Sequence, residues 1–238
     1  MSAGVSTVNV VLDSARGHLN DDEQLVWQDP KIFPKFQEAY REMVNIFDLN
    51  DIPIIYAVSK ILTVPANTSD DSNLDLSTVT DYPTDLLEPI WLKERLPGQR
   101  DTDFVDMQQV DFIPQCEIDE SQLVFWCWIN NAGTGFTIML RGCLQPTEVM
   151  IRYKRYLAPP TELSASVIVP GSEVYLSYRT AALCAASTGS SRFDYLSATA
   201  NINLDMVVCS QIKALQNLPA KRRPYHRGRG RNRVLRDF

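Results

Sequence analysis

The spacing of the apolar residues changes twice along the 238-residue chain, and this feature most constrains the fold. Towards both ends the apolar residues recur every three or four positions, which is the spacing of a helix with one buried face. In the middle they alternate with polar residues or form short continuous runs, which is the pattern of strands. The chain is therefore expected to combine helices with a β-rich region, each burying its own apolar face.

Two helices are predicted in the N-terminal part. The first covers residues 7–16, and Gly17 is suited to end it. The second begins at Asp29, which can cap a helix, with Pro30 at the first helical position, and it continues to about residue 47. The apolar face of this second helix consists of Phe33, Phe36, Tyr40, Met43, Val44 and Phe47.

The middle of the chain is predicted to be β-rich. Its expected strands cover residues 61–64, 123–129, 136–140 and 149–156. The segment Leu123–Ile129 is apolar at every position, so both of its faces must be covered. The turn-forming segment Asn130–Gly135 follows it directly, which predicts a hairpin with the next strand.

Two more helices are predicted after the Pro159–Pro160 break. One covers about Ser172–Ser187, and the other begins at Ser190 or Ser191 and stops before Pro219. The apolar positions of the last helix form one stripe, which consists of Phe193, Leu196, Ala200, Leu204, Val207, Gln211 and Leu215.

Together these patterns predict an α+β fold. We expect an antiparallel helical bundle of two N-terminal and two C-terminal helices, with a central β-rich insertion and a basic C-terminal tail. The expected boundaries are 1–60 for the N-terminal helices, 61–158 for the β-rich insertion, 159–218 for the C-terminal helices and 219–238 for the arginine-rich tail.

The charges are distributed unevenly along the chain. The formal net charge is −6, but residues 221–238 alone carry +7, which leaves −13 on the rest. The basic side chains of this tail are Lys221, Arg222, Arg223, Arg227, Arg229, Arg231, Arg233 and Arg236. A segment of this composition forms no core, and we expect it to contact an anionic partner, with Tyr225 adding a packing surface. Composition leaves two partners open: DNA, or the acidic surface of another protein.

The chain has few residues in patterns typical of catalytic, metal or cofactor sites. Its five cysteines are odd in number and have apolar neighbours, which indicates free thiols in a reducing compartment. The only histidines, His18 and His226, form no cluster with cysteines, so no zinc site is expected. The acidic run Asp21–Glu23 is interpreted as a solvated turn, and Gly133–Gly135 lacks the lysine and helix of a phosphate loop. We therefore expect no catalytic, metal or cofactor site, and we rank an enzyme with dispersed carboxylates lowest among the possible functions.

Three aromatic residues stand close together in the apolar strand: Phe125, Trp126 and Trp128. Alternation places Phe125 on one face of the strand and both tryptophans on the other. A stacking platform for single-stranded nucleic acid would need interleaved lysine or arginine, and there is none. We therefore interpret these residues as a candidate subunit interface or as part of the core.

Several segments resemble, in the same order, the head–tail adaptor proteins of tailed bacteriophages, also called connector or head-completion proteins. The N-terminal segments that carry the resemblance are Ala15–Asp21, Trp27–Asp29 and Phe36–Met43. The middle ones are Tyr82–Pro89, Lys93–Arg95 and Val149–Tyr153, and the later ones are Val169–Gly171 and Tyr175–Ala181.

The resemblance implies a structural virion protein and not an enzyme. Such proteins assemble in the host bacterial cytoplasm as a homo-oligomeric ring, commonly of twelve copies, in the neck of the virion. The ring joins the portal protein to the tail or nozzle proteins, and genomic DNA passes through its channel during ejection. In several adaptors the C-terminal segment docks on the portal, a role that falls here on Leu218–Phe238. The alternative is a nucleic-acid-binding protein that acts through the same arginine-rich tail. No membrane partner is expected, because no stretch approaches the ~20 apolar residues of a bilayer-spanning helix.

Overall fold

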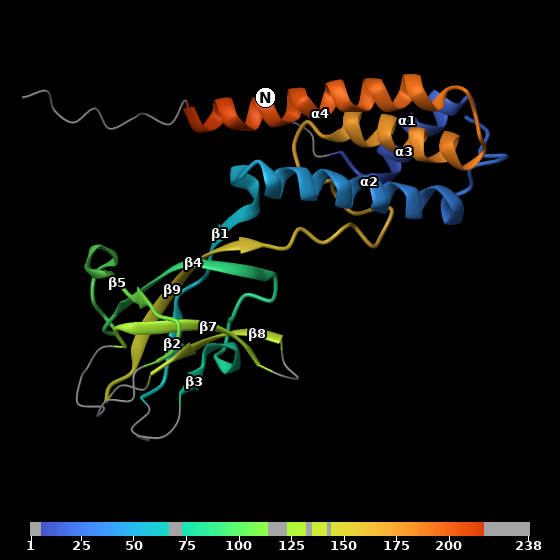
Figure 1. The fold of residues 1–238 in the computed structure, drawn as a ribbon. Helices are drawn as coiled ribbons and strands as arrows, with labels where there is room; N and C mark the ends of the chain where they lie inside the picture. Colours follow the sequence, from blue (N-terminus) through green and yellow to red (C-terminus); the bar gives the residue numbers. More distant parts are fainter. Residues whose placement is uncertain (1–5, 67–72, 114–122, 132–134, 142–143, 217–238) are drawn as a thin grey trace, which may run out of the picture. The chain divides into compact units, whose positions relative to one another are not determined.

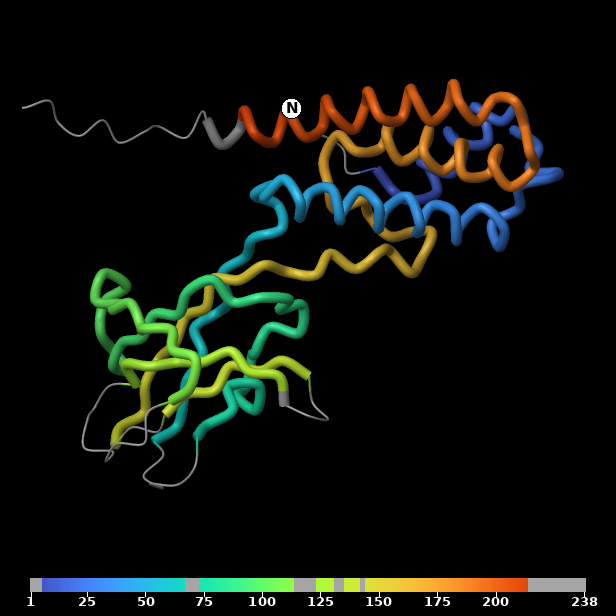
Figure 2. Tube along the Cα trace, viewed as in Figure 1, coloured from blue at the N-terminus to red at the C-terminus, as the bar shows by residue number. Residues whose placement is uncertain are grey.

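The computed structural model describes residues 6–66, 73–113, 123–131, 135–141 and 144–216. These residues form four α-helices and nine strands in two sheets, so the fold class is α+β (Figure 1). They divide into two units: a helical unit, with the residues up to Met43 and from Glu162 onward, and a sheet unit, Val44–Thr161. Segments from both ends of the sequence thus lie together in the helical unit, as the blue and orange parts of the tube in Figure 2 show.

The helices are α1 (Val8–Leu19), α2 (Asp29–Leu49), α3 (Glu173–Ser187) and α4 (Phe193–Gln216). Helix α3 is the central one, because residues on nearly all of its sides are buried, including Tyr175, Thr180, Ala182 and Ala185. Its small side chains let neighbouring helices approach closely, and it packs against both α1 and α4. Helix α1 continues past Gly17, its predicted end, to Leu19, and its C-cap Asn20 adopts the left-handed backbone conformation common at helix C-termini.

The predicted arrangement of the helices is wrong. They do not form an N-terminal pair and a C-terminal pair around a central β insertion: α1 packs against α3, and the last residues of α2, from Val44 to Leu49, belong to the sheet unit. The physical reason is that apolar spacing fixes which face of a helix is buried but not which helix covers it. In α1 the buried residues Val8, Val11, Leu12 and Ala15 recur at helical spacing.

The sheet unit contains two sheets. The five-stranded sheet consists of β1 (Tyr56–Val58), β2 (Leu62–Val64), β4 (Leu86–Arg95), β5 (Val105–Asp106) and β9 (Thr147–Arg155). The four-stranded sheet consists of β3 (Leu74–Asp75), β8 (Gly135–Leu140), β7 (Phe125–Asn131) and β6 (Gln108–Gln109), in that order. Short 3-10 helices cover Pro53–Ile55, Leu76–Thr78 and Asp101–Asp103. The predicted hairpin is confirmed, since β7 and β8 pair antiparallel from Trp126 opposite Leu140 to Asn131 opposite Gly135.

The core of the sheet unit combines inward side chains of both sheets. Its buried members are Leu62, Val64, Leu76, Leu92, Met107, Leu123, Trp126, Ile138, Leu140, Val149, Ile151 and Tyr153. The chain crosses between the sheets at Met107, whose N–H donates to the Leu92 carbonyl at 3.0 Å, while the Gln108 N–H donates to the Val124 carbonyl at 2.8 Å. Both sheets therefore enclose one apolar interior.

A buried carboxylate also joins the two sheets. Glu94 of β4 is 3% exposed, and its oxygens accept the N–H of Leu123 at 2.7 Å and the N–H of Val124 at 3.0 Å. Val124 has a φ of 52°, in the left-handed region that β-branched residues rarely adopt. The two hydrogen bonds to Glu94 hold this unfavourable backbone directly before β7.

Candidate interaction surfaces

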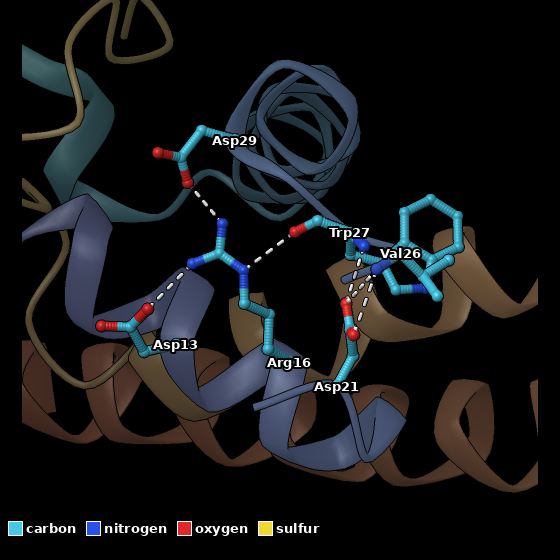
Figure 3. A network of polar contacts seen from close by, with 6 residues as sticks. All are labelled: Asp13, Arg16, Asp21, Val26, Trp27 and Asp29. Atoms are coloured by element: carbon cyan, nitrogen blue, oxygen red, sulfur yellow. Dashed lines mark hydrogen bonds and ion pairs between the residues drawn. The ribbon is translucent and has the colours of Figure 1, made fainter. Parts of the chain in front are cut away.

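The turn between α1 and α2 is held by a buried arginine (Figure 3). Arg16 is 3% exposed; its Nε donates to the Trp27 carbonyl and one Nη to Asp13, both at 2.9 Å, and the other Nη pairs with Asp29. Acceptors from three segments thus surround the guanidinium, which offsets the cost of removing its charge from water. Asp29, predicted as a helix cap, is the first residue of α2, and its carboxylate takes part in this ion pair.

Asp21 fixes the backbone of the same turn. Its carboxylate accepts the N–H groups of Leu25 at 3.0 Å, Val26 at 3.2 Å and Trp27 at 2.6 Å. These donors, that of Trp27 above all, lower the pKa of the Asp21 carboxyl. The prediction of a solvated turn is wrong for Asp21, which is 9% exposed, although its neighbours Asp22 and Glu23 are exposed.

Two apolar side chains project from this rigid turn. Leu25 is 73% exposed and Val26 is 53% exposed, although the N–H groups of both are bound to Asp21. We call these two residues the apolar turn. Next to it lies a surface hollow of about 380 Å³, lined by Leu19, Asn20, Asp21, Val26, Trp27, Ala185, Thr188, Ser190 and Arg192. The hollow places the apolar turn close to the start of α4.

Helix α4 carries a second exposed apolar surface. Its buried stripe is confirmed at Leu196, Ala200, Leu204 and Val207. Beside that stripe, Tyr195, Ile202 and Met206 are 67%, 57% and 62% exposed, and we call these three residues the α4 row.

The members of the α4 row stand seven and four residues apart, a spacing that places them on one face of a helix. The 24 residues of α4 include only three charged side chains, Asp194, Asp205 and Lys213. The sequence shows this spacing, but it gives no separate signal, because the buried stripe by itself is enough to predict the helix.

His18, the histidine within the described part of the chain, contacts a serine. Its ring stacks on Tyr178 with centroids 3.9 Å apart, and its Nε2 lies 3.3 Å from the Ser177 hydroxyl oxygen. Burial lowers the pKa of His18, while Ser177 is 2% exposed and donates its hydroxyl to the Val174 carbonyl at 2.9 Å. This arrangement is a packed contact between α1 and α3, since no substrate can reach a serine so deeply buried.

The three aromatic residues of β7 differ in how deeply they are buried. Trp126 is 1% exposed and lies in the core of the sheet unit. Trp128 is half-buried, packs against that core and stacks on the exposed Phe136 with centroids 5.4 Å apart, and Phe125 is half-buried. Their prediction as a subunit interface stays a prediction.

The remaining predicted contact residues lie outside the described part of the chain. They are the tail residues from Lys221 to Arg236, with Tyr225 among them. Within the described part, no three His, Cys, Asp or Glu side chains come together as a group that could hold a metal ion. Among the described helices, none combines the length and the apolar character needed to cross a membrane. No protein-family model matches the chain, and no curated protein matches it.

Proposed function

We propose that this protein is a structural subunit of a tailed-bacteriophage neck, a head–tail adaptor that assembles into a ring. The observation that carries the proposal is the pair of exposed apolar surfaces on the helical unit, the α4 row and the apolar turn. Apolar surface on a well-packed unit favours contact with other protein chains. Eight sequence segments resemble adaptor proteins in the same order, and this resemblance is the reason for proposing a ring in the phage neck.

Charge supports the same proposal. The chain outside residues 221–238 sums to −13, and the sheet unit carries exposed carboxylates, among them Asp103 and Asp111. A channel wall with this sign repels DNA phosphates, so packaged DNA passes without adsorbing to it. The ring would bind the portal, continue the DNA channel and present a docking surface to the tail proteins, with the basic tail contacting the portal.

Electron microscopy of the purified chain, alone and mixed with purified portal protein of the same phage, tests the proposal. We expect rings, either free or bound to the portal. A protein that stays monomeric with portal present and does not co-sediment with it would refute the assignment.

The second candidate is a nucleic-acid-binding protein acting through the arginine-rich tail. The eight basic side chains among residues 221–238 favour it, because arginine binds phosphate bidentately. It predicts affinity for DNA that falls steeply with salt and disappears when residues 221–238 are removed. A matched control keeps the tail length and replaces the basic residues with glutamine. Equal DNA binding by the control and the natural chain would exclude the tail as the binding element.

A further inference from the structure

A second hollow, of about 550 Å³, lies on the five-stranded sheet over β1, β4 and β9. Arg152 of β9 lines it and is exposed, because its neighbours in the strand on either side are buried and it therefore points away from the core. Trp91 of β4 pairs with Arg152 across the strands and so shares this face. We call six residues that line the hollow or pair across it the mixed face: Tyr56, Glu88, Ile90, Trp91, Arg152 and Lys154.

The mixed face has a basic end at Arg152. The guanidinium of Arg152 lies over the Tyr56 ring, 5.7 Å from its centroid. Within the described part of the chain, the ion pairs of this face all go to Lys154 and none to Arg152. An exposed arginine that stacks on a ring and keeps its donors free is typical of protein interfaces, where tyrosine and tryptophan are also enriched.

The mixed face also has an acidic end, around Lys154. The Nζ of Lys154 lies 3.2 Å from Asp48, 3.7 Å from Asp51 and 3.9 Å from Glu88, so one cation meets three carboxylates. Glu88 is the most distant of the three, and its side chain is 60% exposed. An exposed ion pair at this distance contributes little, so the Glu88 carboxylate can bind a second cation.

The balance of charge selects the kind of partner. Asp48, Asp51 and Glu88 contribute −3, and Lys154 and Arg152 contribute +2, which leaves −1. A nucleic acid needs an excess of cations and the arginine-rich tail needs an excess of carboxylates, so neither matches a face with both signs. A second copy does match, because a two-fold rotation places Glu88 of each copy opposite Arg152 of the other. The nearly balanced charge also lets two copies of an acidic chain approach here with little repulsion.

The strand register places an apolar residue at the centre of such a contact. Glu88 pairs with Lys154, whereas Trp91 pairs with Arg152, so Glu88 and Arg152 are offset along the two strands. Ile90 lies between these levels, is 40% exposed and lines the same hollow. A two-fold axis midway between Glu88 and Arg152 therefore brings Ile90 of both copies together, with an ion pair on each side.

We infer that two copies of the chain pair through the mixed face about a two-fold axis, with Arg152 of each copy bound to Glu88 of the other. This contact goes beyond the proposed ring, because a two-fold contact closes on itself and yields a dimer. The face is small beside the roughly 20–30 residues that each partner contributes to a standard interface. The dimer therefore forms at high protein concentration and dissociates on dilution.

Charge reversal tests the contact in the full chain, by sedimentation equilibrium over a wide range of concentrations. Arg152→Glu and Glu88→Arg each set like charges against each other twice in the dimer, and we expect each to weaken dimerisation by about tenfold or more. Lys60→Glu is the matched control, because it makes the same change of charge at a 78% exposed lysine of the same unit that does not line the hollow. Circular dichroism verifies folding, and Arg152→Gln is a milder variant. A natural chain that stays monomeric, or an Arg152→Glu chain that dimerises like it, would overturn the inference.

A mixture of the two variants is the sharper test. In a pair made of one Arg152→Glu chain and one Glu88→Arg chain, both contacts again join opposite charges. Native mass spectrometry of the two chains, carrying tags of different mass, should show the mixed dimer and little of either homodimer. The chain with both substitutions should dimerise with itself for the same reason. Folded variants that form no mixed dimer would show that Arg152 and Glu88 do not meet.

The results for this contact and for the proposed ring are independent. If rings form with portal protein and the free chain does not dimerise, the mixed face is not an interface while the adaptor proposal stands. If the mixed dimer forms but no ring appears with portal, the adaptor proposal is wrong and the two-fold contact stands.

Discussion

Replacement of Glu94 should destabilise the sheet unit more than replacement of an exposed aspartate or glutamate. Its carboxylate is 3% exposed and accepts two backbone N–H groups, those of Leu123 and Val124, from the other sheet. Hydrogen bonds to a charged group contribute about 1.5–3 kcal/mol each. Because Val124 is half-buried, water can replace part of its bond, and we expect Glu94→Ala to lower the free energy of unfolding by about 3–4 kcal/mol.

Glu94→Gln is the more discriminating variant. The amide retains one acceptor oxygen but turns an NH₂ group towards the second N–H, so we expect a loss of about 2 kcal/mol. Urea unfolding followed by tryptophan fluorescence measures both variants, because Trp126 is buried in the same core. Glu88→Ala is the control: Glu88 lies on the same strand, is 60% exposed and should change stability by no more than about 0.5 kcal/mol. A Glu94→Ala protein within about 1 kcal/mol of the natural chain would refute the reasoning.

Three further outcomes are expected. Arg179→Lys should destabilise the helical unit by about 1–2 kcal/mol in thermal or urea unfolding, because lysine cannot reproduce the two bonds of Arg179 to Glu42 at 2.6 and 2.9 Å. The folded state lowers the pKa of Asp21, so its carboxylate stabilises the fold above the unfolded pKa, and this contribution is lost as pH falls through the folded pKa. Asp21→Asn should therefore weaken the dependence of the melting temperature on pH between pH 2 and 6. A thiol reagent at pH 8 should modify the exposed Cys209 rapidly and leave Cys184 unreacted, because burial raises the pKa of Cys184 to about 12; equal rates would contradict its burial.

The sequence predicts those parts of the fold whose signal is periodic and local. Leu196, Ala200, Leu204 and Val207 are buried as their spacing indicates, and the apolar run ending at Ile129 forms a paired strand. Local spacing does not reveal which surfaces meet, so the packing of α1 against α3 was not predicted.

Several strands and long-range polar contacts were also missed, for physical reasons. Strand β4 has ten residues, but Pro89 and the charged Glu88, Lys93, Glu94 and Arg95 interrupt the alternation of apolar residues. Strands β5 and β6 have two residues each, too few to show alternation, and Met107 between them gives no signal of a crossing between sheets. Glu94 binds N–H groups about 30 residues further along, and nothing near Glu94 in the sequence indicates them. For the candidate surfaces, the α4 row could have been found from its spacing, whereas the apolar turn depends on Asp21 being buried.

The sheet unit is one continuous segment, whereas the helical unit is assembled from two segments that flank it. During synthesis, α1 and most of α2 leave the ribosome long before α3, the helix that buries the apolar face of α1. The sheet unit can therefore complete its core first. The N-terminal helices cannot pack against α3 until residues 44–161 have been synthesised. Closing a loop on the order of 100 residues costs conformational entropy, which a folded sheet unit reduces by bringing its two ends to fixed positions. The order of folding would then be from the middle of the chain outward, and mutations in the core of the sheet unit should slow the formation of the helical unit.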